Sequence, residues 1–238
     1  MKRLILALVF AAAACGAPTH IAPEASPPAE AAVEHSAPPG EYRLEKSHAS
    51  LIVRLGHMGY SQFTARFETW DATLVLDVAA PQNSSIHVTI DPHSIASDNP
   101  PAGFIDIMRG ADFLNATQFP EISFRSTQVE RTGPNTARIV GDLTLHGVTR
   151  PVTLEARFNG GYEGMALDPN GRVGFSAHGV FNRSAFGMAY GIPPEGSNMG
   201  VSDAVEVIIE TEFTGPAWPP QARLRRRLKK KPRRRRGF

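Results

Sequence analysis

Side chains that could perform acid–base, nucleophilic or metal chemistry are scattered through this sequence rather than gathered in motifs. The sequence has no His-Glu-x-x-His, Cys-x-x-Cys, Gly-x-Ser-x-Gly or Gly-x-x-x-x-Gly-Lys pattern. Its eight histidines are dispersed, and the nine-residue spacing of His48 and His57 is not a recurrent metal-ligand interval. An odd spacing also places two side chains on opposite faces of a strand. We therefore predict no catalytic residue, no metal site and no cofactor.

Four polar residues are candidates for the mouth of a cavity: His57, Asp106, Arg109 and Arg183. Asp106 and Arg109 stand at positions i and i+3, which on a helix is typical of a surface ion pair, although such a pair could also line a ligand entrance. His57 is the one candidate base. Together with Asp106 and Arg183 it motivates an alternative hypothesis, a hydrolase that acts on an apolar amide or ester.

A stronger signal is the number of apolar side chains that could surround a ligand. Small residues such as Ala65, Ala177 and Gly179 share strand faces with them and would leave space along an axis. An ordinary core is the competing interpretation for most of these positions. The candidate ligand-binding residues are Phe63, Phe67, Phe104, Ile107, Met108, Phe113, Phe124, Phe175, Ala177, Phe181 and Phe186.

The elements that would position these residues are mostly strands, because apolar and polar residues alternate with a period of two. Ile86, Val88 and Ile90, for example, share one face of their run. The pattern predicts strands near 42–47, 50–57, 62–78, 85–91, 121–130, 136–146, 150–160, 171–184 and 202–213. Residues 101–114 instead carry a helical stripe formed by Phe104, Ile107, Met108 and Ala111.

This element content predicts an all-β domain, for which a sandwich and a closed barrel are the two main solutions. Periodicity alone does not choose between them. Closure removes exposed strand edges, and about eight strands enclose just enough space for side chains or one small ligand.

The two ends of the chain differ from its body. Residues 1–15 read as an export signal, with Lys2 and Arg3 before a short apolar run and then Cys15, the only cysteine. Cys15 is either an acylated lipoprotein N-terminus or a free thiol after cleavage behind Ala14. Residues 16–40 are rich in proline and alanine and are predicted to be a disordered tether.

Charge divides the remaining chain into an acidic body and a basic tail. Residues 41–215, the predicted barrel domain, contain 12 basic and 20 acidic residues. In the predicted disordered tail, 216–238, eleven of the fourteen residues from 223 to 236 are Lys or Arg. The tail is either a solvated end or an attachment to an anionic membrane. Export argues against nucleic acid as its partner.

Four blocks of residues, in order, resemble the YceI-like family over roughly residues 42–213. They are Ser47-His48-Ala49-Ser50 with His57-Met58-Gly59-Tyr60, then Asp112-Phe113-Leu114 with Phe119-Pro120-Glu121, then Gly141-Asp142-Leu143-Thr144 with Gly147-Val148-Thr149, and finally Asn182-Arg183-Ser184-Ala185-Phe186-Gly187-Met188. One departure is the helix Phe104-Ile105-Asp106-Ile107-Met108-Arg109, which lacks the histidine that the family often has there.

The resemblance implies an eight-stranded antiparallel lipocalin-like barrel with one or two short helices. It also implies an apolar tunnel for a long-chain isoprenoid lipid, such as an isoprenoid quinone or a polyprenyl phosphate, and no common catalytic machinery. We therefore expect an exported periplasmic protein, in one form a membrane-anchored lipoprotein, that carries or stores such a lipid. The alternatives are the hydrolase and an envelope adaptor attached to membrane by its basic tail, 223–238. A dimer is one option for its oligomeric state.

Overall fold

The computed structural model describes residues 31–217. The export signal, Cys15, most of the tether and the basic tail from residue 218 onward therefore lie outside the described residues. Within the described part, no helix is long and apolar enough to cross a membrane.

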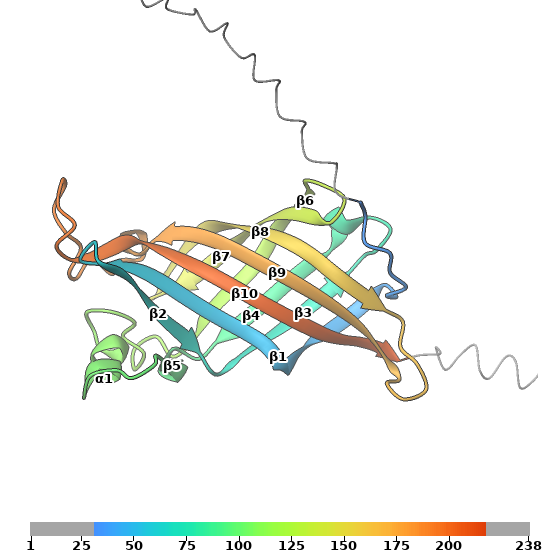
Figure 1. Cartoon of the computed structure of the whole chain (residues 1–238), viewed down its shortest axis with the longest axis horizontal. Coiled ribbons are helices and arrows are strands. Elements are labelled where there is room, and N and C mark those ends of the chain that lie inside the picture. Colours follow the sequence, from blue (N-terminus) through green and yellow to red (C-terminus); the bar gives the residue numbers. More distant parts are fainter. Residues whose placement is uncertain (1–30, 218–238) are drawn as a thin grey trace, which may run out of the picture. The chain divides into compact units, whose positions relative to one another are not determined.

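The described residues form ten strands, one α-helix and three short 3-10 helices (Figure 1). The strands are β1 (Gly40–His57), β2 (Ser61–Phe67), β3 (Trp70–Leu76), β4 (Ser85–Ile90), β5 (Ile95–Ala96), β6 (Ile122–Arg131), β7 (Thr136–Leu145), β8 (Val148–Tyr162), β9 (Asn170–Asn182) and β10 (Val201–Ala217). The helices are α1 (Phe104–Arg109), η1 (Pro81–Asn83), η2 (Pro92–Ser94) and η3 (Arg183–Phe186).

These strands close into a barrel whose neighbours are all antiparallel. The order runs β10, β9, β8, β7, β6, β4, β3, β1, and β1 also pairs with β10, which completes a ring. β2 pairs with the C-terminal half of β1 and β3 with its first residues, so β2 and β3 share one position in the ring. The predicted eight-stranded antiparallel barrel is confirmed, and the two-residue strand β5 pairs with the end of β2.

Two strand predictions differ from the structure in an informative way. The predicted strands 42–47 and 50–57 are one strand, β1, whose register against β10 shifts between Leu44 and Ala49. The extra residues form a bulge that interrupts the alternation. The predicted strand 62–78 is divided into β2 and β3 at Glu68 and Thr69, which lie outside both strands.

The core lies inside the barrel, where each strand sends every second side chain. Val173 on β9 is 1% exposed and Phe213 on β10 is 3% exposed. A two-residue turn joins β7 to β8, and both of its residues, His146 and Gly147, have positive φ angles. This is the backbone geometry that favours a tight hairpin.

The single α-helix is shorter than the predicted segment 101–114. It begins after Gly103, whose φ of +77° is left-handed, and ends at Arg109 before Gly110. Of the predicted stripe, Met108 is buried, whereas Ile107 is 56% exposed and Ala111 lies beyond the helix. We call the end of the barrel that carries α1, where β1 ends, the α1 end.

Residues 31–39, which we call the strap, pack against the opposite end of the barrel. Asn135 accepts a hydrogen bond from the Val33 N–H at 2.7 Å and donates one to the Ala31 carbonyl at 2.7 Å. The Tyr42 hydroxyl donates to the Pro38 carbonyl at 2.6 Å. This part of the predicted disordered tether is therefore held in place, and we call this end of the barrel the strap end.

Candidate ligand-binding site

A cavity of about 160 Å³ occupies the barrel interior at the α1 end. Every second residue of several strands faces it, and α1 and its following loop add Met108 and Phe113. Among the described residues that line it, Arg183 alone is charged. Its strand-borne lining includes Leu51, Val53, Leu55, Phe67, Val88, Ile90, Ile122, Phe124, Leu143, Leu145, Val152, Leu154, Phe181, Val205, Val207 and Ile209.

A second cavity of about 210 Å³ lies at the strap end. Its wall combines apolar side chains with polar groups, including His35 of the strap. The His35 ring meets the Phe158 ring edge-on, with centroids 4.9 Å apart. The apolar lining includes Leu74, Leu76, Ile86, Val129, Ile139, Ala156, Phe158 and Phe175, and the polar lining includes Asp77, Ser84, Ser85, Arg131, Asn135 and Thr136.

The two cavities share no lining residue, yet they are neighbours along the same strands. On β4, Ile86 lines the strap-end cavity and Val88 the α1-end cavity. On β8, Ala156 lines the strap-end cavity and Leu154 the α1-end cavity. One layer of side chains therefore separates the two spaces.

Two inward-facing glycines allow large side chains to lie flat on the barrel wall. A Cβ atom on Gly141 of β7 would come within 2.3 Å of the Phe124 ring. A Cβ atom on Gly179 of β9 would come within 2.7 Å of a Leu154 methyl group. Because the glycines leave these places free, the Phe124 and Leu154 side chains occupy the wall rather than the centre of the barrel.

Arg183 is a buried cation that organises the loop between η3 and β10 at the α1 end. Its side chain is 2% exposed and burial lowers the pKa of its guanidinium. It donates hydrogen bonds to the carbonyls of Met188, Tyr190, Val201 and Ser202 at 2.8–3.0 Å. The Met188 and Tyr190 carbonyls belong to the segment that links η3 to β10, and the Val201 and Ser202 carbonyls belong to the first residues of β10. The guanidinium therefore fastens that segment to the start of β10.

Polar atoms that lack a partner also gather in the loops of the α1 end. Among the described residues, four buried side-chain polar atoms have no hydrogen-bond partner. Three of them lie at this end: Ser97 Oγ and His146 Nε2 belong to its loops, and Arg109 Nε belongs to the last residue of α1. Buried polar groups are normally hydrogen-bonded, so these atoms are available to water or to a ligand.

The predicted ligand-binding residues divide into three groups. Five of them line the α1-end cavity, namely Phe67, Met108, Phe113, Phe124 and Phe181. Phe175 lines the strap-end cavity. The others line neither. Phe63 and Phe104 pack on each other with ring centroids 5.5 Å apart, and Phe186 packs behind Phe181 at 5.3 Å. Ile107 points outward, and Ala177 lies between the two cavities.

The predicted polar mouth is not one constellation. Arg183 lines the α1-end cavity, but it donates its hydrogen bonds to backbone carbonyls. Asp106 pairs with Arg109 at 3.6 Å on α1, the surface ion pair that their spacing predicts. His57 is exposed at the end of β1. No position among these favours the hydrolase hypothesis.

Sequence reasoning missed the strap and the polar residues that it covers. The available signal was the change at Pro38 from proline-rich sequence to the alternating sequence of β1. We interpreted the proline-rich composition only as a tether. Within residues 31–217, no group of three or more His, Cys, Asp or Glu residues could hold a metal ion.

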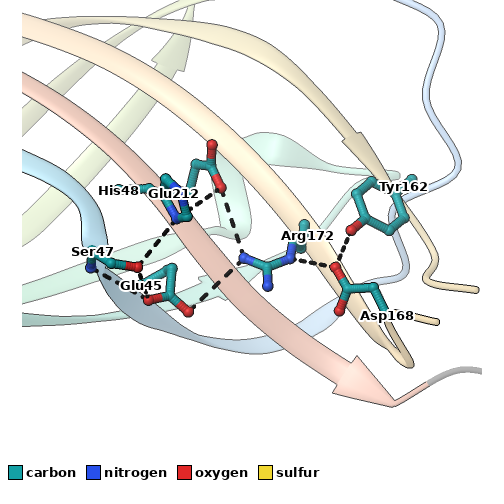
Figure 2. A network of polar contacts seen from close by, with 7 residues as sticks. All are labelled: Glu45, Ser47, His48, Tyr162, Asp168, Arg172 and Glu212. Carbon is teal, nitrogen blue, oxygen red and sulfur yellow. Dashed lines mark hydrogen bonds and ion pairs between the residues drawn. The ribbon is translucent and has the colours of Figure 1, made fainter.

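A polar network fastens the outer surface of the barrel near the strap end (Figure 2). Arg172 on β9 donates to Asp168 at 2.6 Å and pairs with Glu45 of β1 at 3.9 Å and Glu212 of β10 at 3.7 Å. Asp168 also accepts a hydrogen bond from Tyr162. The hydrogen bonds from Tyr162 and Arg172 lower the pKa of the Asp168 carboxyl. The network thus ties the β8–β9 turn to the two strands that close the barrel.

The β1 bulge contributes the other side of this network. Ser47 donates a hydrogen bond to the Glu45 carboxylate at 2.7 Å, and this contact lowers the pKa of Glu45. His48 lies 3.8 Å from the Glu212 carboxylate (Figure 2). These residues point away from both cavities, so their arrangement supports the fold rather than a ligand.

Comparison with known proteins connects this geometry to a family. A family model described as a YceI-like domain matches residues 42–213. A UPF0312 protein of Pseudomonas fluorescens is 40% identical over 152 residues, which cover 62% of this chain and 76% of that protein. Protein YceI of Salmonella arizonae is 36% identical over 181 residues, which cover 74% and 88%.

Solved structures share the barrel. The YceI protein of Campylobacter jejuni matches with a TM-score of 0.57 and 25% identity, over 66% of this chain and 88% of that one. Burkholderia cenocepacia BcnA matches with a TM-score of 0.60 and 21% identity, over 71% and 98%. A polyisoprenoid-binding domain from Saccharophagus degradans matches with a TM-score of 0.53 and 11% identity, over 75% and 100%. The last two likenesses concern the fold alone.

Proposed function

The chain belongs to the YceI-like family, and we propose that its barrel binds a long-chain apolar lipid of the isoprenoid type and carries or stores it. The observation that carries the proposal is the α1-end cavity, whose wall is apolar apart from Arg183. Such an apolar space inside the barrel suits a ligand whose free energy of binding comes from leaving water.

The size of the gain depends on enclosure. Burying one methylene group contributes about 0.8 kcal/mol, before the costs of ordering and association are subtracted. A chain that lay in a surface groove would keep part of its area in water. A barrel interior removes nearly all of it, which a carrier needs if its cargo is to cross an aqueous compartment.

Extraction of the native protein tests this proposal directly. Organic extraction followed by mass spectrometry should recover an isoprenoid or another long-chain lipid from the purified full chain. Val207→Phe fills the α1-end cavity from β10 and should reduce the recovered lipid severalfold. Val180→Phe makes the same change on the 60% exposed outer face of β9 and should leave it unchanged. Equal lipid content in both variants would exclude the cavity as its site.

We further propose that the protein acts outside the cytoplasm. The support is the sequence of residues 1–15, with its basic start and its apolar run before Cys15. Metabolic labelling with a radioactive fatty acid should mark the wild-type chain and not Cys15→Ser. Label that persists in the variant would place the acylation elsewhere.

The basic tail supports a compatible second role, attachment of the protein to an anionic lipid surface. Deleting residues 223–238 should lower binding to vesicles that contain phosphatidylglycerol, and salt should weaken binding of the full chain by screening. Equal binding of the full and shortened chains would dismiss the role.

A further inference from the structure

We propose that the turn between β8 and β9 inserts Met165 and Leu167 into the surface of an anionic membrane, so that the barrel docks with its strap end toward the lipid. The partner is the interfacial layer of a bilayer that carries anionic head groups. This inference rests on the attachment by the basic tail proposed above and adds to it the part of the folded barrel that meets the lipid.

The turn exposes three consecutive apolar side chains to water. Met165, Ala166 and Leu167 all lie on the surface, where Met165 is 52% exposed and Leu167 is 96% exposed. Turns are normally built from glycine, proline and polar residues. A run of three exposed apolar residues is unfavourable in water unless it serves a function. The tip of this turn therefore has the composition of a contact surface.

Hydrogen bonds at the base of the turn hold this tip in place. The Met165 N–H donates to the Asp168 carbonyl at 2.7 Å. The Asp168 carboxylate accepts hydrogen bonds from Arg172 at 2.6 Å and from Tyr162 (Figure 2). Because the backbone of the turn is already ordered, little conformational entropy is left to lose when Leu167 enters a membrane.

The tip lies beside both ends of the described chain. Ala217, the last residue of β10, pairs with Asn170 at the beginning of β9, three residues after Leu167. On the side of the strap, the Glu163 N–H donates to the Ser36 hydroxyl at 3.2 Å. Figure 1 shows the turn beside the end of β10. The tip thus belongs to the strap end of the barrel.

The position of Ala217 keeps the start of the basic run near the tip. Residues 218–222 separate Ala217 from Arg223, where the run begins. Five residues span at most about 20 Å, so a tail bound to anionic head groups holds the tip close to the same surface. The tail supplies electrostatic attraction and the tip buries apolar area in the interface. Two linked attachments bind more tightly than either alone.

The charges around the tip explain why both attachments are needed. Asp168 is paired with Arg172 at 2.6 Å and adds little repulsion. Glu163 is exposed beside the tip, and residues 41–215 contain 20 acidic against 12 basic residues. An anionic surface would therefore repel the barrel by itself. The tip enters the lipid when the tail has brought it there.

The apolar side chains exposed at the α1 end are a poorer membrane contact. The Tyr60 hydroxyl lies 3.9 Å from the Met199 sulfur, and the Tyr190 ring packs against the Phe113 ring with centroids 5.5 Å apart. These side chains contact neighbours within the loops of that end. Asp106, whose side chain is 83% exposed on α1, adds a negative charge there. The strap end is therefore the end that we expect to meet the lipid.

Site-specific fluorescent labelling tests which part of the barrel meets the lipid. In the full chain, Cys15→Ser removes the only cysteine, and Leu167→Cys, Met199→Cys or Val180→Cys then supplies one thiol for an environment-sensitive dye. Met199 at the α1 end and Val180 on the outer face of β9 are 61% and 60% exposed and serve as matched controls. On vesicles of phosphatidylglycerol and phosphatidylcholine, only the dye at position 167 should shift its emission to the blue, because it alone leaves water.

Vesicle affinity gives a second measurement. Leu167→Ser should weaken binding to these vesicles about three- to tenfold, because complete removal of a leucine side chain from water corresponds to about tenfold or more and an interfacial position gains part of this. Val180→Ser makes the same kind of change on the side of the barrel and should leave the affinity unchanged. Salt should still weaken binding of Leu167→Ser, because its tail is intact.

The outcomes separate this inference from the attachment on which it rests. If the chain binds the vesicles while the dye at position 167 stays in water, or if the dye at position 199 shifts as much, the inference is overturned and attachment by the tail stands. If the full chain does not bind these vesicles, both fail. Circular dichroism verifies that each variant is folded, and Met165→Ser repeats the affinity test at the neighbouring position if Leu167→Ser is not.

Discussion

Replacing Arg183 with methionine should destabilise the protein more than any other single substitution of an arginine in the barrel. The side chain is 2% exposed and donates four hydrogen bonds to the carbonyls of Met188, Tyr190, Val201 and Ser202. Methionine matches much of the arginine's length but has no donor. Four carbonyls would then lack the partner that holds them.

The magnitude follows from the number and type of these bonds. A hydrogen bond to a charged group contributes about 1.5–3 kcal/mol, so four bonds set an upper limit of about 6–12 kcal/mol. Two effects reduce this limit. The variant no longer carries the free-energy cost of burying a guanidinium, and the four carbonyls can bond partly to water. Each buried carbonyl left without a partner costs about 1–3 kcal/mol, so with this relief the net loss should be about 3–5 kcal/mol. For a domain of this size it corresponds to a fall in Tm of about 6–20 °C.

Urea unfolding monitored by circular dichroism measures this loss. Arg150→Met removes an exposed arginine from β8 and should change stability by no more than about 0.5 kcal/mol. Arg183→Lys keeps the charge but offers a compact ammonium in place of a planar fork, so its loss should be intermediate. If the free energy of unfolding of Arg183→Met lies within about 1 kcal/mol of the wild-type value, the guanidinium does not hold the loop between η3 and β10, and this reasoning is refuted.

Three other predictions concern pH and packing. Burial raises the pKa of Tyr42 to about 12, so its contribution to stability is complete below about pH 10 and is lost as pH rises toward 12. This loss, about 2–3 kcal/mol, should be absent from unfolding curves of Tyr42→Phe. The pKa of Asp168 is lowered, so its contribution is present above its ordinary pKa, near 4, and is lost as pH falls through the lowered value. The stability gap between wild type and Asp168→Asn should accordingly narrow in acid, and a gap that is constant with pH would contradict the network. Gly141→Ala would place a Cβ atom 2.3 Å from the Phe124 ring. Such overpacking should lower the free energy of unfolding by about 1–3 kcal/mol, as measured by thermal melts. Gly174→Ala is the control, because its Cβ atom would meet its nearest neighbour at 3.7 Å.

The barrel was predictable because its physical signal is local. Alternation assigns Val88 and Ile90 to the inner face of their strand without knowledge of the neighbours, and both line the α1-end cavity. The hairpin at His146 and Gly147 is also a local feature, because its two positive φ angles suit a tight turn that contains glycine. The bulge in β1 was not predictable, because it depends on the register that β10 imposes at Leu44.

The site was predictable only in part. An inward position does not say which cavity a side chain reaches, and Phe175 faces the strap end while Phe181, on the same strand, faces the α1 end. Phe63 and Phe104 pack against each other and line neither cavity. The strap was missed because its order comes from contacts distant in sequence, such as the one between Val33 and Asn135.

The pairing of β1 with β10 has a consequence for how the protein folds during its synthesis. Leu44 faces Phe213, so the seam joins the beginning and the end of the described chain. A ribosome releases the N-terminal strands long before the partner of β1 exists, and such distant pairing makes folding slow. Until β10 arrives, β1 and β9 present bare strand edges that invite association with other chains. The nascent protein therefore needs either a chaperone or a delay in folding until synthesis is complete.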